Sequence, residues 1–364
     1  MTRLRQRIGI GAASLCLCAL PAAAQQAAET SPAGEARPVI EALDLDRIGE
    51  GPAPWTSLEA LDADAQFHFV VVTDRTGGHR EGVWAEAMEK INLTRPAFVI
   101  SVGDLIEGYT EDRAQLDREW QELTAMVDTL VPPFFYVAGN HDYSNAAMSE
   151  VWADRFGPSY YAFRYKDTLF VVLNSSIFNE ANDPPPEWVE AHDRQMAWLE
   201  NTLTENSDVR WTYLFMHHPF WREFWWRTIE GDGWLGERGA QPDSRYATGP
   251  AEWRKARALL SERSYTAFAG HTHTYEYDAG AVGPHTHEHI SLATTGGGVT
   301  IRPRDEGRRT ELKGPDYAEF DHFVWVTMTE DGPVIANLLL DGIVPKDFDH
   351  FFKQPPLNAA SADE

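Results

Sequence analysis

Apolar residues along this chain form two patterns, short unbroken runs and longer segments with helical spacing. The short runs have the length of buried strands, at residues 67–73, 97–102, 134–138, 168–173, 211–216 and 266–269. The helical segments lie between them, at residues 83–92, 114–130, 187–203 and 252–260. This alternation of strands and helices predicts an α/β architecture.

The last part of the chain has a different pattern. Three further strands are predicted at residues 289–294, 322–327 and 334–340, without helices between them. Consecutive strands without crossover helices favour antiparallel pairing. We therefore expect a second, more antiparallel sheet beside the first.

Polar side chains with ligand chemistry follow five of the predicted strands. They are Asp74, Asp104, Asn140, His217, and His271 together with His273. In an open α/β sheet, functional groups gather at the carboxyl ends of the strands. A mixture of carboxylate, amide and imidazole donors suits Zn, Mn or Fe, and two neighbouring ions suit phosphoester hydrolysis.

The stretch Gly139-Asn140-His141-Asp142 places three such groups side by side. Asn140 offers a neutral oxygen ligand, His141 a proton that is exchangeable near neutral pH, and Asp142 a carboxylate to orient that imidazole. Gly, Asn and Asp are also common in turns, so the tetrapeptide alone is equally compatible with an ordinary strand-to-loop turn.

The net charge of the chain limits the classes of partner that we expect it to bind. Its 364 residues carry a formal net charge of −25. Nucleic acid and anionic membranes are repelled by such a surface, so neither is an expected partner. A small anionic substrate remains possible where metal ions reverse the local sign.

The first residues have the pattern of an export signal. Arg3, Arg5 and Arg7 precede an apolar stretch that ends near Leu20, and residues 22–24 are alanines. We expect cleavage before Gln25 and a periplasmic or secreted product without a membrane span. Both cysteines, Cys16 and Cys18, lie in the segment to be removed, so any metal site should use oxygen and nitrogen ligands.

The expected organisation has four parts. Residues 1–24 are the signal peptide, residues 25–65 a flexible lead-in rich in Ala, Glu, Pro and Gly, residues 66–345 the folded domain, and residues 346–364 a tail.

In their order along the chain, the strand-end motifs resemble those of the calcineurin-like metallophosphoesterases. The matching blocks are Asp74, Gly103-Asp104, Gly139-Asn140-His141-Asp142, His217-His218-Pro219 and Gly270-His271-Thr272-His273. Five blocks in order are a specific signal, whereas any one alone is weak. The resemblance spans roughly residues 66–340 and implies a four-layer αββα sandwich of two mixed sheets flanked by helices.

The resemblance also implies roles for the site residues. Asp104 would bridge two metal ions; Asp74 and His273 would bind the first, and Asn140, His217 and His271 the second. His141 would lie beside the leaving-group oxygen as the general acid, oriented by a carboxylate. A metal-bound hydroxide would then attack the phosphorus of a phosphomonoester or phosphodiester.

One motif departs from the family pattern. The family usually has a histidine two residues after the first aspartate, and here that position is Thr76. Purple acid phosphatases, a related branch, also lack this histidine and use a tyrosine three residues after the bridging aspartate, where this chain has Glu107. Glu107 either supplies the missing ligand or only hydrogen-bonds His141, and His79 is a weaker replacement.

Several other residues have a structural interpretation as well as a functional one. Arg75 could contact a phosphate oxygen or pair with a surface acid. His218 should point away from His217 and lie behind the site. His285, His287 and His289 form an alternating set that could bind a metal, but with the main site already filled they are expected in an exposed loop. The main rival function is a non-catalytic binding protein of the same fold with a degraded first metal site.

Overall fold

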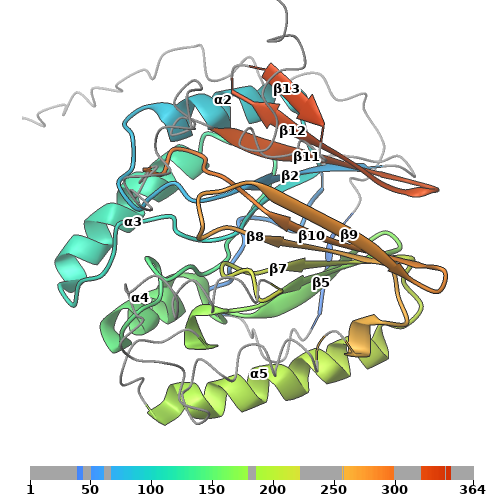
Figure 1. Ribbon diagram of the computed structural model, residues 1–364. Helices are drawn as coiled ribbons and strands as arrows, with labels where there is room; N and C mark the ends of the chain where they lie inside the picture. Colours follow the sequence, from blue (N-terminus) through green and yellow to red (C-terminus); the bar gives the residue numbers. More distant parts are fainter. Residues whose placement is uncertain are drawn as a thin grey trace, which may run out of the picture. The chain divides into compact units, whose positions relative to one another are not determined.

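Two β-sheets lie face to face in the computed structural model, which describes residues 39–43, 51–60, 67–178, 186–221, 256, 258–298, 321–340 and 342–345 (Figure 1). These residues belong to a single unit of the chain, residues 37–364. The expected signal peptide and tail lie outside the described residues, as does most of the expected lead-in. The described part of that lead-in, residues 39–43 and 51–60, is not a flexible segment: residues 41–42 pair with residues 163–164, and Ile40 and Ala60 are buried in the core.

The six-stranded sheet has the order β13-β12-β11-β2-β3-β4. Its parallel part is β2 (Phe67–Val72), β3 (Phe98–Ser101) and β4 (Phe134–Phe135). Its antiparallel part is β11 (His322–Thr329), β12 (Gly332–Leu339) and β13 (Gly342–Pro345), and β11 pairs with β2. The expectation that the last strands form a separate sheet is therefore wrong, because these strands extend the sheet of β2 and the strand predicted at residues 289–294 belongs to the other sheet.

The seven-stranded sheet has the order β1-β5-β6-β7-β8-β10-β9. Its parallel centre is β6 (Thr168–Val172), β7 (Trp211–Phe215), β8 (Tyr265–Ala269) and β10 (His285–Ser291). Its antiparallel edges are β1 (Glu41–Ala42), β5 (Tyr161–Tyr165) and β9 (Glu276–Val282).

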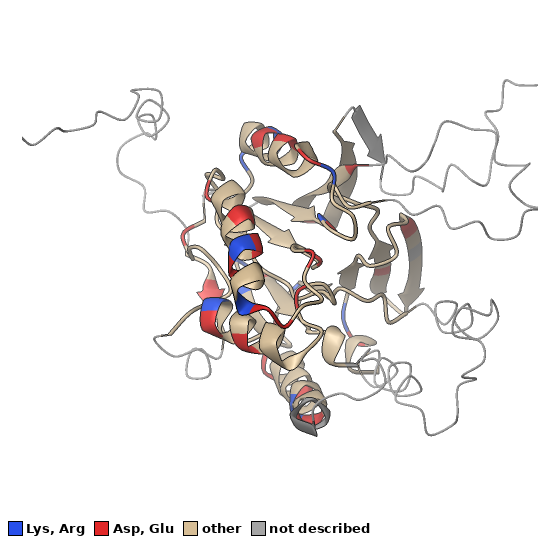
Figure 2. Cartoon of the chain, turned by 90° about the vertical axis from the view of Figure 1, so that its left-hand side faces the viewer, with Lys and Arg blue, Asp and Glu red and all other residues tan. Residues whose placement is uncertain are grey.

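Helices cover the outer face of each sheet, so the four-layer αββα sandwich expected from the sequence is confirmed (Figure 1). Helices α2 (Val83–Thr94), α3 (Arg113–Val127) and α4 (Ala146–Phe156) share a core with the six-stranded sheet. Helix α5 (Pro186–Glu205), which follows the short 3-10 helix η1 (Ser176–Phe178), shares one with the seven-stranded sheet. Charged residues lie mainly on these helices, whose outer faces meet water (Figure 2).

Strand alternation builds the layers. On β2, Phe69 and Val71 face the other sheet, whereas Val70 and Val72 face the helices. Aromatic rings fill the space between the sheets: the Phe170 centroid lies 5.1 Å from that of Phe98 and 5.3 Å from that of Phe69, both edge-on. Such pairs add to the stabilisation from burial and fix how the two sheets face each other.

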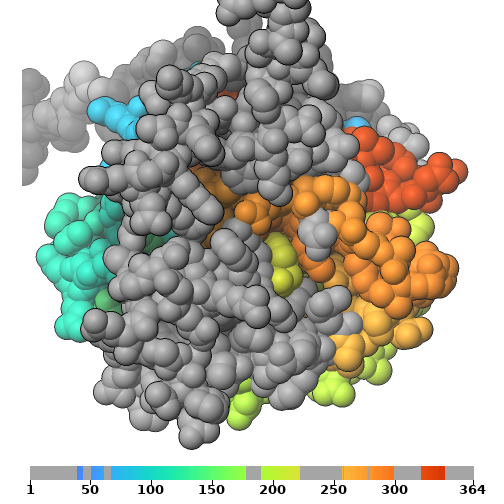
Figure 3. Space-filling view, viewed as in Figure 1, coloured from blue at the N-terminus to red at the C-terminus, as the bar shows by residue number. Residues whose placement is uncertain are grey.

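The expectation of an exposed loop at His285, His287 and His289 is wrong. All three lie on β10, which pairs with β8 on one side and β9 on the other, and His287 and His289 are buried. The sequence of β9 is rich in Ala and Gly, so its pairing with β10 was not apparent. The orange segments of Figure 3 show where this part of the chain reaches the surface.

No helix among the described residues has the length and apolar character needed to cross a bilayer.

Candidate metal centre

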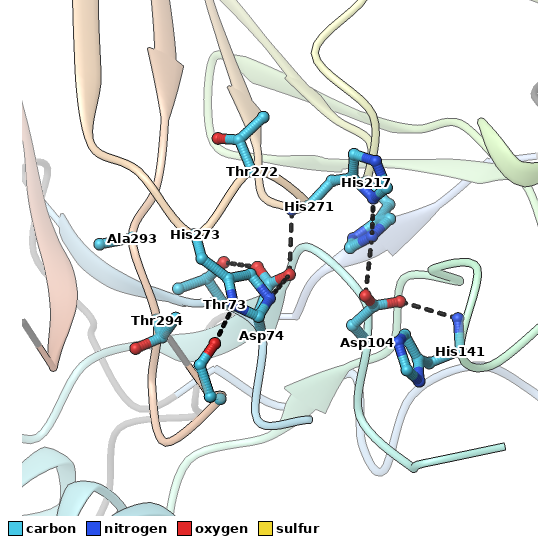
Figure 4. A network of polar contacts seen from close by, with 12 residues as sticks. Thr73, Asp74, Asp104, His141, His217, His271, Thr272, His273, Ala293 and Thr294 are labelled. Carbon is cyan, nitrogen blue, oxygen red and sulfur yellow. Dashed lines mark hydrogen bonds and ion pairs between the residues drawn. The ribbon is translucent and has the colours of Figure 1, made fainter. Parts of the chain in front are cut away.

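The expected ligand residues meet where strands of both sheets end. Asp74 follows β2, Asp104 follows β3, and Asn140 comes after β4 in the six-stranded sheet. His217 follows β7, and His271 and His273 follow β8, in the seven-stranded sheet. Figure 4 shows the two aspartates pointing toward these histidines.

Nitrogen and oxygen atoms with lone pairs face one another at short distances. His217 Nε2 lies 3.0 Å from Asp104 Oδ2, and His273 Nε2 lies 3.1 Å from Asp74 Oδ1. His271 Nδ1 lies 2.8 Å from Asn140 Oδ1 and 3.2 Å from His217 Nε2. Separations near 3 Å are those of donor atoms that share one ion with bonds of about 2.0–2.2 Å.

Backbone carbonyls fix the tautomers of two imidazoles. His217 Nδ1 donates to the Val102 carbonyl at 2.9 Å, and His273 Nδ1 donates to the Gly298 carbonyl. The lone pair of each neutral ring is therefore on Nε2, which faces a carboxylate. Metal-ligating histidines are held in this way, with the second ring nitrogen bonded to a carbonyl or carboxylate.

The electrostatics of the cluster favour positive charge beside its two carboxylates. Burial raises the pKa of the Asp104 carboxyl, but the neighbouring His217 outweighs burial and holds the pKa well below its ordinary value. Burial lowers the pKa of His217, but Asp104 and then Asp74 raise it to about 9. A proton on His217 thus occupies the place that suits a cation between two acceptors.

The remaining imidazoles respond to that charge. Burial and then the charge of His217 lower the pKa of His271 to about 3. Burial also lowers the pKa of His273, but Asp74 outweighs it and raises the pKa above its ordinary value. The donor set fits metal ions: among the described residues, Asp74, Asp104 and His217 form one potential ligand group, and His217, His218 and His271 another.

Three of these residues have a strained backbone conformation. Asp104, His271 and His273 have φ values of 57°, 68° and 51°, in the left-handed region that non-glycine residues rarely adopt. Such strain persists where the surroundings over-determine it, and it concentrates at functional sites. At Gly139, an added Cβ would lie 2.2 Å from Asp104 Oδ1, so only glycine allows this approach.

The role expected for Asp142 needs correction. Its carboxylate does not orient the His141 ring. It accepts hydrogen bonds from the backbone N–H groups of Asp104, Leu105, Ile106 and Gly139, at 2.7–3.1 Å. Both oxygens are used in this way, so Asp142 holds the loop that presents Asp104.

His141 is oriented by a carbonyl instead. Its Nδ1 lies 2.7 Å from the backbone oxygen of Glu107, and its own N–H donates to Asp104 Oδ1 at 2.9 Å. A Cβ on Gly77 would lie 3.8 Å from His141 Nε2 and 3.0 Å from His273 Cε1. The free ring nitrogen of His141 therefore faces the same space as His273.

The Glu107 carboxylate follows neither of its two expected uses. It accepts from the backbone N–H groups of Gly78 and His79, at 3.1 and 2.9 Å, and lies 3.1 Å from His79 Nδ1. It thereby holds the glycine-containing loop beside Asp74, and only its backbone carbonyl touches His141. The His79 ring lies against this carboxylate, so it does not replace the missing ligand histidine.

Arg75 and His218 also have defined surroundings. The expectation that His218 points away from His217 is wrong, because its ring centroid lies 5.0 Å from that of His217 and 4.3 Å from that of His271. Arg75 donates to the Leu105 carbonyl and pairs with Glu122 on α3, which favours the structural reading over a phosphate contact. The Ser175 hydroxyl accepts from the backbone N–H groups of His217 and His218 and lies 2.9 Å from His218 Nδ1. With both lone pairs used, this hydroxyl donates its proton to Nδ1.

The sequence did not predict two residues at the site, Ser175 and Tyr109. The clamp of Ser175 on the His217 backbone depends on β6 lying beside β7. The Tyr109 hydroxyl accepts from Asn140 Nδ2, and its ring meets His141 edge-on at 4.5 Å. No spacing rule indicates such a contact, although the preceding Gly108 marks a tight turn.

Comparison with known proteins places these motifs in a family. The sequence model described as calcineurin-like phosphoesterase matches residues 67–275. A rat protein named serine/threonine-protein phosphatase CPPED1 is 31% identical over 141 residues, which are 37% of this chain and 43% of the rat protein. The human protein of that name is 28% identical over 145 residues, 38% and 44% of the two chains. The chain thus spans less than half the length of these curated relatives.

Solved structures share the fold. A zebrafish dimetal phosphatase superposes with a TM-score of 0.50 at 15% identity, covering 76% of this chain and 98% of its own. A Plasmodium protein, GAP50, described as the anchor in the inner membrane complex, has a TM-score of 0.50 at 14% identity, with 76% and 85% covered. At these identities the likeness concerns the fold alone.

Replacing Asp142 tests its role as the clamp on the Asp104 loop. Asp142→Asn puts an amide NH₂ against backbone N–H groups, and each buried donor left unmet costs about 1–3 kcal/mol. We expect metal affinity to fall about 10–100-fold, as for other partners that orient ligands. Titration with metal and a thermal melt measure both effects. Asp112→Asn, at the N-cap of α3, is the matched control, because Asn caps a helix as well as Asp; equal metal affinity in both variants would exclude the clamp.

Proposed function

Because this chain belongs to the calcineurin-like phosphoesterase family, we propose that it is a dinuclear, metal-dependent phosphoric ester hydrolase. The observation that carries the proposal is the meeting of the buried Asp74, Asp104 and His217 with the half-buried His271 and His273, whose ring nitrogens and carboxylate oxygens lie 3.0–3.2 Å apart. Oxygen and nitrogen donors of this kind suit divalent Zn, Mn or Fe.

Each proposed ion has its own ligand group. Asp74 and His273 would hold the first ion, and Asn140, His217 and His271 the second. Asp104 would serve both, because it forms a potential ligand group with Asp74 and His217, and its carboxylate faces His217 of the second group. When bound, the ions supply neutralisation of phosphate charge and activation of water for attack on phosphorus.

The chain itself contributes a proton donor. We assign this role to His141, since its Nε2 faces the space beside His273 while the Glu107 carbonyl holds its Nδ1. In the protonated ring, Nε2–H can pass its proton to the leaving oxygen as the P–O bond breaks. The Glu107 carbonyl accepts from Nδ1–H in both states, so the ring keeps its orientation.

Phosphomonoesters or phosphodiesters are the proposed substrates. The curated relatives are named serine/threonine-protein phosphatases, which makes phosphomonoesters of serine and threonine the first class to assay. The rival is a non-catalytic binding protein, and two observations favour it as second candidate: Thr76 stands where the family has a ligand histidine, and the fold also occurs in a protein described as an anchor.

Asp104→Asn tests the dinuclear proposal. One neutral amide would replace a charge that serves both ions, so we expect loss of metal and of activity with the fold retained. Elemental analysis measures the metal content, circular dichroism the fold and phosphatase assays the activity, all on the same sample. Asp117→Asn on α3, in an exposed ion pair, is the control. If Asp104→Asn bound two ions and had near wild-type turnover, the dinuclear proposal would be wrong. An inactive wild-type chain that binds one ion or none would favour the non-catalytic binding protein.

His141→Ala tests the proton donor. General-acid catalysis contributes about 10²–10⁴ in rate, and it matters most for a poor leaving group. We expect the variant to keep both metals and to slow alkyl phosphate hydrolysis by about that factor, but p-nitrophenyl phosphate much less. The ratio of the two rate losses is the measurement. Equal losses would exclude the acid role, and loss of a metal would make His141 a ligand.

We also propose that the protein is exported, on the composition of residues 1–24. Mass spectrometry of the exported protein should show a chain that begins near Gln25 and lacks both cysteines. An exported chain with its first residues intact, or with lipid on Cys16 or Cys18, would contradict this processing.

A further inference from the structure

Tyr109 lies in an unusual position beside the candidate metal centre. It belongs to the loop between β3 and α3, its side chain is 58% exposed, and its φ is +49°. The preceding Gly108 has a φ of +55°, and a Cβ there would lie 1.7 Å from the His141 carbonyl oxygen. The loop therefore rests directly on the His141 backbone, where only glycine fits.

Further bonds hold this loop in one conformation. The Gly108 N–H donates to Glu119 Oε2 of α3 at 2.9 Å, and the Glu107 carbonyl accepts from His141 Nδ1. Residues 104–106 are held by Asp142. An exposed aromatic residue on a loop held this firmly has a fixed place relative to the site, which is what a positioning residue needs.

The Tyr109 side chain touches two residues with proposed roles. Its hydroxyl accepts a hydrogen bond from Asn140 Nδ2, and its ring lies edge-on to His141, with centroids 4.5 Å apart at 69°. Because the amide nitrogen of Asn140 is engaged by the phenol, the amide oxygen is directed to the other side. There it lies 2.8 Å from His271 Nδ1, within the second ligand group.

We propose that Tyr109 is a positioning and specificity residue of this site. Its hydroxyl sets the amide of Asn140 so that the oxygen, the only ligand atom of that amide, points toward His271 and would be available to the second ion. Its ring supports His141 and provides an apolar wall on the leaving-group side, suited to phosphoesters with an aryl or otherwise apolar leaving group. The assignment rests on the proposed function, because that function gives Asn140 and His141 their roles.

The two parts of the side chain are separable by mutation. Tyr109→Phe keeps the ring and removes the hydroxyl, so we expect the second ion to bind about 10–100-fold more weakly and the first ion unchanged. Tyr109→Ala also removes the wall, so we expect the KM of p-nitrophenyl phosphate to rise about three- to tenfold relative to Tyr109→Phe. The KM of glycerol phosphate, whose leaving group is small and polar, should not change between the two.

The experiment is a titration of the metal-free chain with Zn²⁺ or Mn²⁺ against a chromophoric chelator, followed by steady-state kinetics on both esters. Tyr160→Phe is the matched control, since the Tyr160 ring packs against Trp198 of α5 and the same hydroxyl is lost away from the site. Circular dichroism of each variant verifies folding, and Tyr109→Phe, the milder change, carries the decision on metal affinity.

The outcomes separate this assignment from the proposed function. If the wild-type chain binds two ions and hydrolyses phosphoesters, but Tyr109→Phe binds the second ion as tightly as Tyr160→Phe does, the hydroxyl role is overturned and the function stands. Equal KM values for the aryl ester in Tyr109→Phe and Tyr109→Ala overturn the wall. A wild-type chain that binds no metal and has no activity would overturn both the proposed function and the role of Tyr109.

Discussion

Two buried carboxylates dominate this structure, because Asp74 and Asp104 lie in the interior with almost no contact with water. Burying a charge is unfavourable unless an opposite charge accompanies it. The imidazoles of His217 and His273 meet the carboxylates at 3.0 and 3.1 Å, and backbone carbonyls turn their lone pairs toward them. The site is thus built to hold positive charge, and its strained backbone and close glycine contacts serve that end.

Ligands from two sheets can meet only if the sheets are held in a fixed relation. The six-stranded sheet carries Asp74, Asp104 and Asn140, whereas the seven-stranded sheet carries the histidines. Between them lies a layer of aromatic rings in which Phe170 of β6 contacts Phe69 and Phe98 across the interface. Large rigid side chains in a close-packed core keep the two sheets from sliding past each other. The donor atoms of the two sheets can therefore stay about 3 Å apart.

The fold and the ligand group were accessible from the sequence for one physical reason. Strands buried on both faces give unbroken apolar runs, and the first polar residue after each run marks the end of a strand. This rule found Asp74, Asp104 and the three histidines, which the structure brings together. It fails where side chains bind the backbone: Asp142 and Glu107 both accept from N–H groups, which every sequence has and no motif reveals. It also fails at His287 and His289, whose burial depends on β10 lying between β8 and β9.

Thr76 lies in a loop that several other contacts hold in place. A histidine ligand at that position would tie the loop after Asp74 to the site, and threonine provides no such tie. Here the loop is held from the side, because Glu107 accepts from the N–H groups of Gly78 and His79. The loop also packs against Gly298, where a Cβ would lie 2.6 Å from the Gly77 carbonyl oxygen. Glycines at 77, 78 and 298 and the carboxylate of Glu107 therefore act together to hold this loop beside Asp74.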